Sequence, residues 1–179
     1  QIGLLDQPKP SIAVLPFDNL SGDLEQDYFA DGITEDIITN LSLFDSFDVI
    51  ARNSSFQYRD SAVDIRRVGE ALSANYVLEG SVRRDGNSLR VTAQLVDTLD
   101  GSHLWAKRFD RSLNVGAIFE IQDQIASEIA GTLGGAHGVI TETGVAEARR
   151  KPPETLASYE CVLLAQDYMR TLTSETHLS

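Results

Sequence analysis

Apolar residues in the first part of the chain follow two different spacings. Residues 12–15 are consecutively apolar and end at Pro16, which predicts a short buried strand. Between residues 27 and 44 the apolar side chains recur every three or four positions, the spacing of a helix. Residues 47–51 predict a second short strand, and residues 65–72 a second helix. The chain therefore begins as strand, helix, strand, helix.

Alternating apolar and polar residues in the middle of the chain predict a β-hairpin. A type I′ turn at Asp85-Gly86 would join its strands and pair Val82 with Leu89. A turn placed one residue later would set Arg83 opposite Arg90, and like charges directly opposite each other are unfavourable. We therefore expect the first register.

A second Asp-Gly turn, Asp100-Gly101, reverses the chain into a third strand over residues 103–110. Counting the alternation through this turn places Trp105 and Phe109 on the polar face of the hairpin, away from its aliphatic face. Two explanations are open: a β-bulge resets the count, or another layer or a partner covers both aromatic rings. In the second case Trp105 and Phe109 belong to an interaction surface, for example in a dimer.

A long helix over residues 118–133 ends at Gly134-Gly135. The order β-α-β-α-β-β-β-α predicts an α/β fold, with a mixed five-stranded sheet and packed helices. The predicted domains are a leader at 1–10, an α/β domain at 11–135, a linker at 136–155 and the start of a further helical region at 156–179.

Charge limits the kinds of partner that this chain of 179 residues can bind. Its net charge of −12 argues against nucleic acid, because a duplex repels such a surface. Between Lys9 and Arg52 all charged residues are acidic, whereas the stretch from Arg52 to Arg111 holds most of the basic ones. The two stretches can face each other within the fold, face each other across a dimer, or form two solvated surfaces.

No apolar run reaches the roughly 20 residues of a membrane helix, so we expect no membrane insertion by this fragment. Its one cysteine, Cys161, excludes an internal disulfide and is expected to be a small buried apolar residue. His103, His137 and His177 lie outside any recognisable nucleophile motif. We therefore expect no catalytic residue, metal or cofactor, and no enzyme activity in this fragment.

The loop that follows the first strand, residues 18–23, contains Asp, Asn, Ser and Gly. It lacks both phosphate-binding fingerprints, and the same residue types form turns and cap helices. Asp27, Asp31 and Glu35 follow at intervals of four, so their carboxylates share one face of the helix. A divalent ion normally takes ligands from several elements. We therefore expect a solvated or partner-facing acidic stripe.

A binding crevice is the main alternative. Ligands of open sheets favour the carboxyl ends of parallel strands. The loops after the first two strands would bring Asp18 and Asn19 near Arg52, Asn53 and Ser54. These groups could hold a small polar ligand or a nucleotide, or they could fix the two loops to each other by hydrogen bonds.

Several segments together resemble the TolB amino-terminal-domain-like family. They are residues 11–19 (SIAVLPFDN), 28–37 (YFADGITEDI), 49–52 (VIAR), 76–83 (YVLEGSVR) and 104–106 (LWA). The resemblance covers residues 11 to about 134. It implies the TolB amino-terminal fold for this part of the chain.

The amino-acid sequences of these motifs are most similar to the version found in large bacterial signalling proteins. The resemblance implies a parent in which a class III adenylate cyclase domain or a winged-helix activator precedes this module and tetratricopeptide repeats follow it. Residues 152–159 are similar to the usual entry into the first repeat. We expect a non-catalytic sensory or protein-interaction module, on the cytoplasmic or the periplasmic side of a membrane-anchored parent protein.

Overall fold

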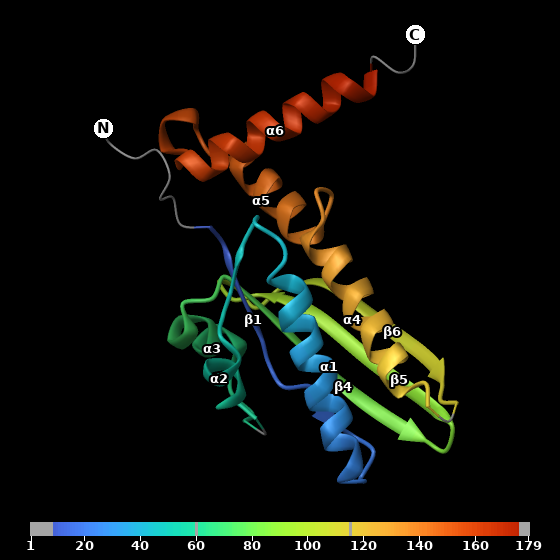
Figure 1. The fold of residues 1–179 in the computed structure, drawn as a ribbon. Coiled ribbons are helices and arrows are strands. Elements are labelled where there is room, and N and C mark those ends of the chain that lie inside the picture. Colours follow the sequence, from blue (N-terminus) through green and yellow to red (C-terminus); the bar gives the residue numbers. More distant parts are fainter. Residues whose placement is uncertain (1–8, 60, 115, 176–179) are drawn as a thin grey trace.

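The computed structural model describes residues 9–59, 61–114 and 116–175, which form a twisted sheet with helices on both faces (Figure 1). The elements are β1 (Ser11–Val14), β2 (Asp18–Asn19), α1 (Glu25–Leu41), β3 (Asp48–Val49), α2 (Arg52–Phe56), α3 (Ile65–Leu72), β4 (Tyr76–Asp85), β5 (Ser88–Asp97), β6 (His103–Ser112), α4 (Ile118–Gly134), α5 (Val139–Arg150), a 3-10 turn (Pro153–Thr155) and α6 (Ser158–Glu175).

The predicted α/β class with a mixed sheet is confirmed. The strand order is β3-β1-β4-β5-β6, parallel from β3 to β4 and antiparallel from β4 to β6. A sixth strand was not predicted: β2 pairs with β4 beyond the end of β1. β1 and β2 lie one after the other along the same edge of β4, and Pro16, which has no N–H for the ladder, separates them.

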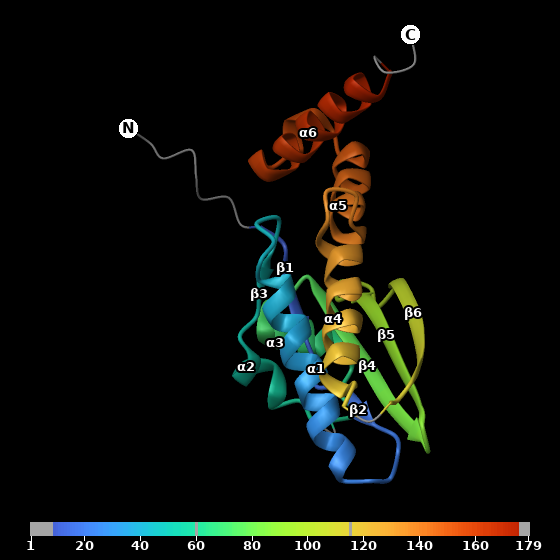
Figure 2. The ribbon, with the colours of Figure 1, turned by 45° about the vertical axis from the view of Figure 1, so that its right-hand side comes forward.

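One face of the sheet, here called the inner face, is covered by α1 and α4, which lie side by side across it (Figure 2). Both helices bury the apolar stripe that the sequence predicted, including Ile33 and Ile37 of α1 and Ile125 and Ile129 of α4. This layer holds the main hydrophobic core.

The opposite, outer face is covered only in part. α3 packs against the start of β4, where Val68 meets Ala13 and Val77 in a second, smaller core. The helix lies so close that a Cβ added at Gly69 would come within 2.3 Å of Thr98. Thr98 follows β5 and lies beside the start of β4, so this contact holds α3 at one end of these strands and leaves the opposite ends of β4, β5 and β6 beyond its reach.

The expected hairpin register was wrong. Val82 pairs with Val91 and Arg83 does lie opposite Arg90, because the turn is Gly86-Asn87. Gly86 has φ +56° and Asn87 does not have a positive φ, the pattern of a type II′ turn with Gly at its first central position. The repulsion between Arg83 and Arg90, on which the prediction rested, is offset by Asp110 of β6, which pairs with Arg90.

A bulge explains the unexpected side of the aromatic residues on β6. The register between β5 and β6 shifts between Leu95 and Val96, so that Trp105 pairs with Leu95 and Phe109 with Val91 on the inner face. Phe109 is 2% exposed, and Trp105 packs against the main core. The expectation of an interaction surface made of Trp105 and Phe109 is therefore corrected: a bulge brings both rings onto the core side.

The segment predicted as a linker is largely helical. α5 occupies residues 139–150, and α6 lies across its end rather than standing without a partner. Leu163 of α6 is buried against Gly144, and the Tyr159 hydroxyl donates to the carbonyl of Ser46 at 3.1 Å. Whether 136–155 joins two domains stays a prediction. No helix among the described residues is both long and apolar enough to cross a membrane.

Two glycine-to-alanine substitutions test this packing. Gly80→Ala would place a Cβ 2.3 Å from the Thr92 carbonyl oxygen and 2.5 Å from the Phe17 ring, so we expect the free energy of unfolding to fall by about 1–3 kcal/mol. Gly131→Ala in α4 meets no atom within 4 Å and should raise it by up to about 1 kcal/mol. Urea unfolding of both variants measures the difference. Equal stability of Gly80→Ala and the parent chain would contradict the placement of β2 and β4.

Candidate functional site

The loop after β1 is organised by its own side chains. The Asn19 amide donates to the carbonyl of Asp23 and to the carboxylate of Asp27, both at 2.7 Å. Its oxygen accepts from the Ser21 N–H at 2.9 Å, and the Asp23 carboxylate accepts from the Glu25 N–H at 3.0 Å. These bonds form a turn and satisfy donors at the start of α1. They account for the polar composition of the loop without a ligand.

The acidic stripe of α1 is matched by arginines from the region of α2. Asp31 pairs with Arg59 at 2.5 Å and Glu35 with Arg52 at 2.7 Å. The Arg52 guanidinium also lies over the Phe56 ring, 3.9 Å from its centroid. Of the three arrangements that the sequence left open for the two charged stretches, contact within the fold holds for these residues. Asp31 and Glu35 are therefore engaged within the chain rather than reserved for a partner.

The structure does not bring Asp18 and Arg52 together. β2 carries Asp18 along β4, whereas Arg52 opens α2 after β3, and β1 lies between these strands. Asp18 lines two hollows, and neither has Arg52 in its described wall. Asn53 and Ser54 lie in the first turn of α2 instead of a loop. The crevice expected from the carboxyl ends of the first two strands is thus divided by the strand order.

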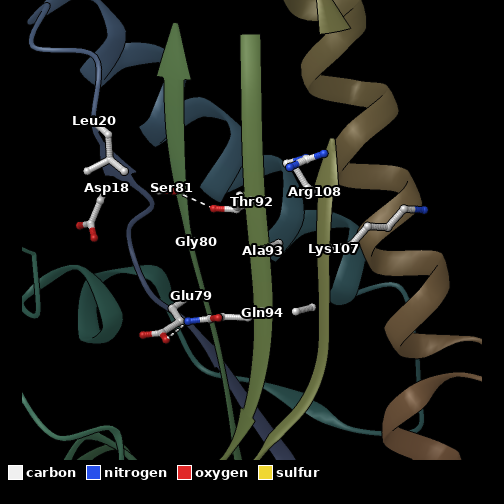
Figure 3. Close-up of a pocket in the computed structure, with 11 residues that line it drawn as sticks. Asp18, Leu20, Glu79, Gly80, Ser81, Thr92, Ala93, Gln94, Lys107 and Arg108 are labelled. Carbon is white, nitrogen blue, oxygen red and sulfur yellow. Dashed lines mark hydrogen bonds between the residues drawn. The ribbon is translucent and has the colours of Figure 1, made fainter. Parts of the chain in front are cut away.

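The open part of the outer face carries three cross-strand rows of mostly polar side chains, and Figure 3 shows the first two of them. In the order β4, β5, β6, the rows consist of Glu79, Gln94 and Ala106; Ser81, Thr92 and Arg108; and Arg83, Arg90 and Asp110. The Gln94 amide donates to the Glu79 carboxylate, and the Ser81 and Thr92 hydroxyls are 2.7 Å apart. A shallow hollow of about 620 Å³ runs over the first two rows, from Asp18 to Arg108.

Arg83, Arg90 and Arg108, here called the arginine cluster, lie on three neighbouring strands of the outer face, and two of them bind the same carboxylate. Asp110 accepts from Arg90 at 2.6 Å and from Arg108 at 3.0 Å. The hydrogen bond from Arg90 is the largest cause that lowers the pKa of Asp110, and the charge of Arg108 adds to it. Arg83 is exposed and has no ion-pair partner among the residues that the structure describes. Asp85 lines the same hollow as Arg83, Arg90 and Asp110, so the three cations of the cluster lie near two carboxylates and a small excess of positive charge remains.

The inner side of β6 is attached to α4 by a different set of charges. Lys107 and Arg111 both pair with Glu128 of α4, and they flank the Phe109 ring at 5.2 and 5.9 Å from its centroid. Figure 3 shows Lys107 extending toward α4. These two cations are used to hold the strand in place, so they do not add to the arginine cluster.

Within the described ranges, no three His, Cys, Asp or Glu side chains are grouped so that they could hold a metal ion. Cys161 is exposed, which corrects the expectation that it is buried. The polar outer face is the feature that the sequence prediction missed. Its signal was present in the alternation that predicted the strands, since the polar residues at positions 79, 81 and 83 alternate with Leu78, Gly80 and Val82. Because the predicted hairpin register was wrong and the bulge between β5 and β6 was not placed, the sequence did not show which residues form the rows of the outer face.

Comparison with known proteins identifies the family. Residues 8–128 match the family described as the HilA/YgeH-like transcriptional regulator, second domain. The chain belongs to this family. The match ends within α4, so it comprises the whole sheet and the outer face described above.

The curated relative that matches is named "Putative adenylate cyclase 3", from Rhizobium meliloti (strain 1021). It is 58% identical over 125 residues, which cover 70% of this chain and 21% of that protein. The chain thus spans about a fifth of the length of this relative.

Two solved structures are similar in fold. Lipoprotein GNA1162 from Neisseria meningitidis matches with a TM-score of 0.50 and 21% identity, over 69% of this chain and 98% of that one. TolB from Acinetobacter baumannii matches with a TM-score of 0.49 and 20% identity, over 73% of this chain and 29% of that one. The likeness to the lipoprotein shows a shared fold and says nothing of function. The link to tetratricopeptide repeats stays a prediction.

The charge balance of the arginine cluster can be tested by Asp110→Asn. The substitution leaves Arg83 and Arg90 opposite each other without the carboxylate that offsets them, so we expect lower stability at low salt. The loss should shrink in about 1 M salt, where the screening length falls to about 3 Å. Thermal unfolding at both salt concentrations measures it. Asp45→Asn, at an exposed residue remote from the outer face, is the matched control, and an equal effect of both would contradict the assignment.

Proposed function

We propose that the chain is a non-catalytic recognition module of a bacterial signalling protein, which binds another protein and transmits that binding to the neighbouring domains. The observation that carries this proposal is the uneven covering of the sheet. Around β1 and the start of β4 helices pack on both faces, whereas in the described part of the chain the rest of β4, β5 and β6 has α4 and α1 on the inner face only. The uncovered area is polar, hollowed and adjacent to a free strand edge. Such an area suits a protein partner better than an enclosed small molecule.

The output of the parent protein is part of the same proposal. The family is described as a domain of transcriptional regulators, and the 58% identical relative carries the name of a cyclase. A module shared by both kinds of parent is expected to work by recognition rather than by its own chemistry. We favour an adenylate cyclase parent and a role in cAMP signalling, because the cyclase relative is the one with high identity over this module.

Helical repeats beyond α6 fit the surface of that helix. Leu163 is buried against α5, whereas Val162 and Tyr168 are 52% and 64% exposed. A helix pair with apolar side chains on its outer side can receive a further repeat, since such units bury their faces on neighbours. This supports the proposed connection to a tetratricopeptide-like region.

A direct assay tests the non-catalytic part. The chain, incubated with ATP and Mg²⁺ or Mn²⁺, should form no cyclic AMP above the level of the heat-denatured chain. Turnover that depends on the folded chain would overturn the proposal.

The recognition role is tested in the full-length parent protein. Ala106 is exposed on the outer face of β6, so Ala106→Trp should obstruct that face and change the regulated output without lowering the unfolding temperature. Ala146→Trp, at an exposed position of α5, is the matched control. If both variants respond like the parent protein, the outer face is not the recognition surface.

A further inference from the structure

The free edge of β6 offers backbone groups for another strand. β6 is ten residues long and pairs with β5 along one side. No strand in the described part of the chain pairs with its other side. After the bulge, residues 105–110 keep a regular register with β5. A straight edge of this length is a template for strand addition, and proteins usually shield such edges.

The charges on β6 do not shield this edge in the usual way. Lys107 and Arg111 are directed to Glu128 of α4, and Asp110 is held by Arg90. Arg108 is the other cation of the strand; it lies on the outer face, shares Asp110 with Arg90 through its Nε, and forms no other ion pair with the residues that the structure describes. The edge is therefore expected to bind a negatively charged strand better than a neutral or a positively charged one.

We propose that the β6 edge receives an extended acidic segment of the partner protein as an added strand, and that the arginine cluster binds its carboxylates. This rests on the proposed function and names the partner's chemistry. A strand beside β6 would set its outward side chains about 5 Å from Ala106 and Arg108. The small Ala106 leaves room there, and Arg108 can bind a carboxylate with two parallel hydrogen bonds.

The alternate side chains of the added strand would face the inner side. There they would lie next to Trp105, which is half-buried on the core. The favoured segment therefore alternates acidic and apolar residues. This pattern matches the two faces of the strand that it would extend.

A second copy of the chain is the less favourable occupant. Two β6 edges paired antiparallel about Arg108 would set the Arg108 side chains of both copies opposite each other, and like charges across a sheet are destabilising. Nucleic acid is also less favourable, because the arginine cluster is small and the chain as a whole carries a net charge of −12. An acidic segment needs only the local excess of positive charge.

The test uses a fluorescent ten-residue peptide of alternating Glu and Val and measures its fluorescence anisotropy with the folded chain. We expect saturable binding that weakens with salt. Arg108→Gln should weaken binding about tenfold or more, because a hydrogen bond to a charged group is lost. Arg83→Gln should weaken it less, and Arg67→Gln, at an exposed arginine of α3, should leave it unchanged.

Two further peptides separate strand addition from simple attraction of charge. A peptide with the same composition in scrambled order, and one N-methylated at alternate residues, should both bind at least tenfold more weakly. Equal binding of either peptide would overturn strand addition. Tighter binding of a random DNA duplex than of the peptide, or a dimer in sedimentation that Arg108→Gln strengthens, would overturn the acidic partner.

The failure of this inference can be told from the failure of the proposed function. If the peptide does not bind but Ala106→Trp still changes the output of the full-length protein, the acidic strand is wrong and the recognition surface stands. If the peptide does not bind and Ala106→Trp leaves the output unchanged, the proposed recognition surface is wrong as well.

Discussion

The packing of α1 against α4 on the inner face is the contact on which the rest of the structure depends. The helices approach closely at Gly32, where a Cβ would come within 2.4 Å of the Gln122 amide. Gln122 is buried and donates to the carbonyl of Phe29 at 3.2 Å, so a polar side chain bridges the two helices inside the core. With both helices placed on this face, β5, β6 and the part of β4 beyond α3 direct their apolar side chains toward it. The opposite face is then free to carry polar groups.

Uneven covering of the sheet follows from the lengths of its elements. β1 and β3 are short and α3 has eight residues, so the outer layer covers only the start of β4. β4, β5 and β6 have ten residues each and continue past it. Their outer rows therefore remain accessible, and the arginine cluster lies at the far end of them. The proposed recognition surface is a consequence of this difference in length.

The fold, rather than the order of charged residues along the sequence, decides where positive and negative charge lie on the surface of this chain. Asp31 and Glu35 are paired within the chain, and much of the acidic stripe is thus neutralised locally. On β4 to β6, Arg90 and Arg108 bind Asp110, and Arg83 lies opposite Arg90. A net charge of −12 consequently conceals a positive area on the outer face, and the area has a defined position relative to the free edge of β6.

Local patterning in the sequence determined the elements and the class of this protein. Apolar spacing is a property of each segment, and it correctly predicted the main helices, the principal strands and the mixed sheet. Only the tertiary structure decided which residues meet across strands. The turn at Gly86 changes the partner of Val82 from Leu89 to Val91 without exchanging the faces, whereas the bulge beside Leu95 shifts β6 by one residue and exchanges its two faces. The tertiary structure also decided the order of the strands, which places β1 between Asp18 and Arg52 although their loops were predicted to be near each other. The strand pairing brings Arg83, Arg90 and Arg108 together.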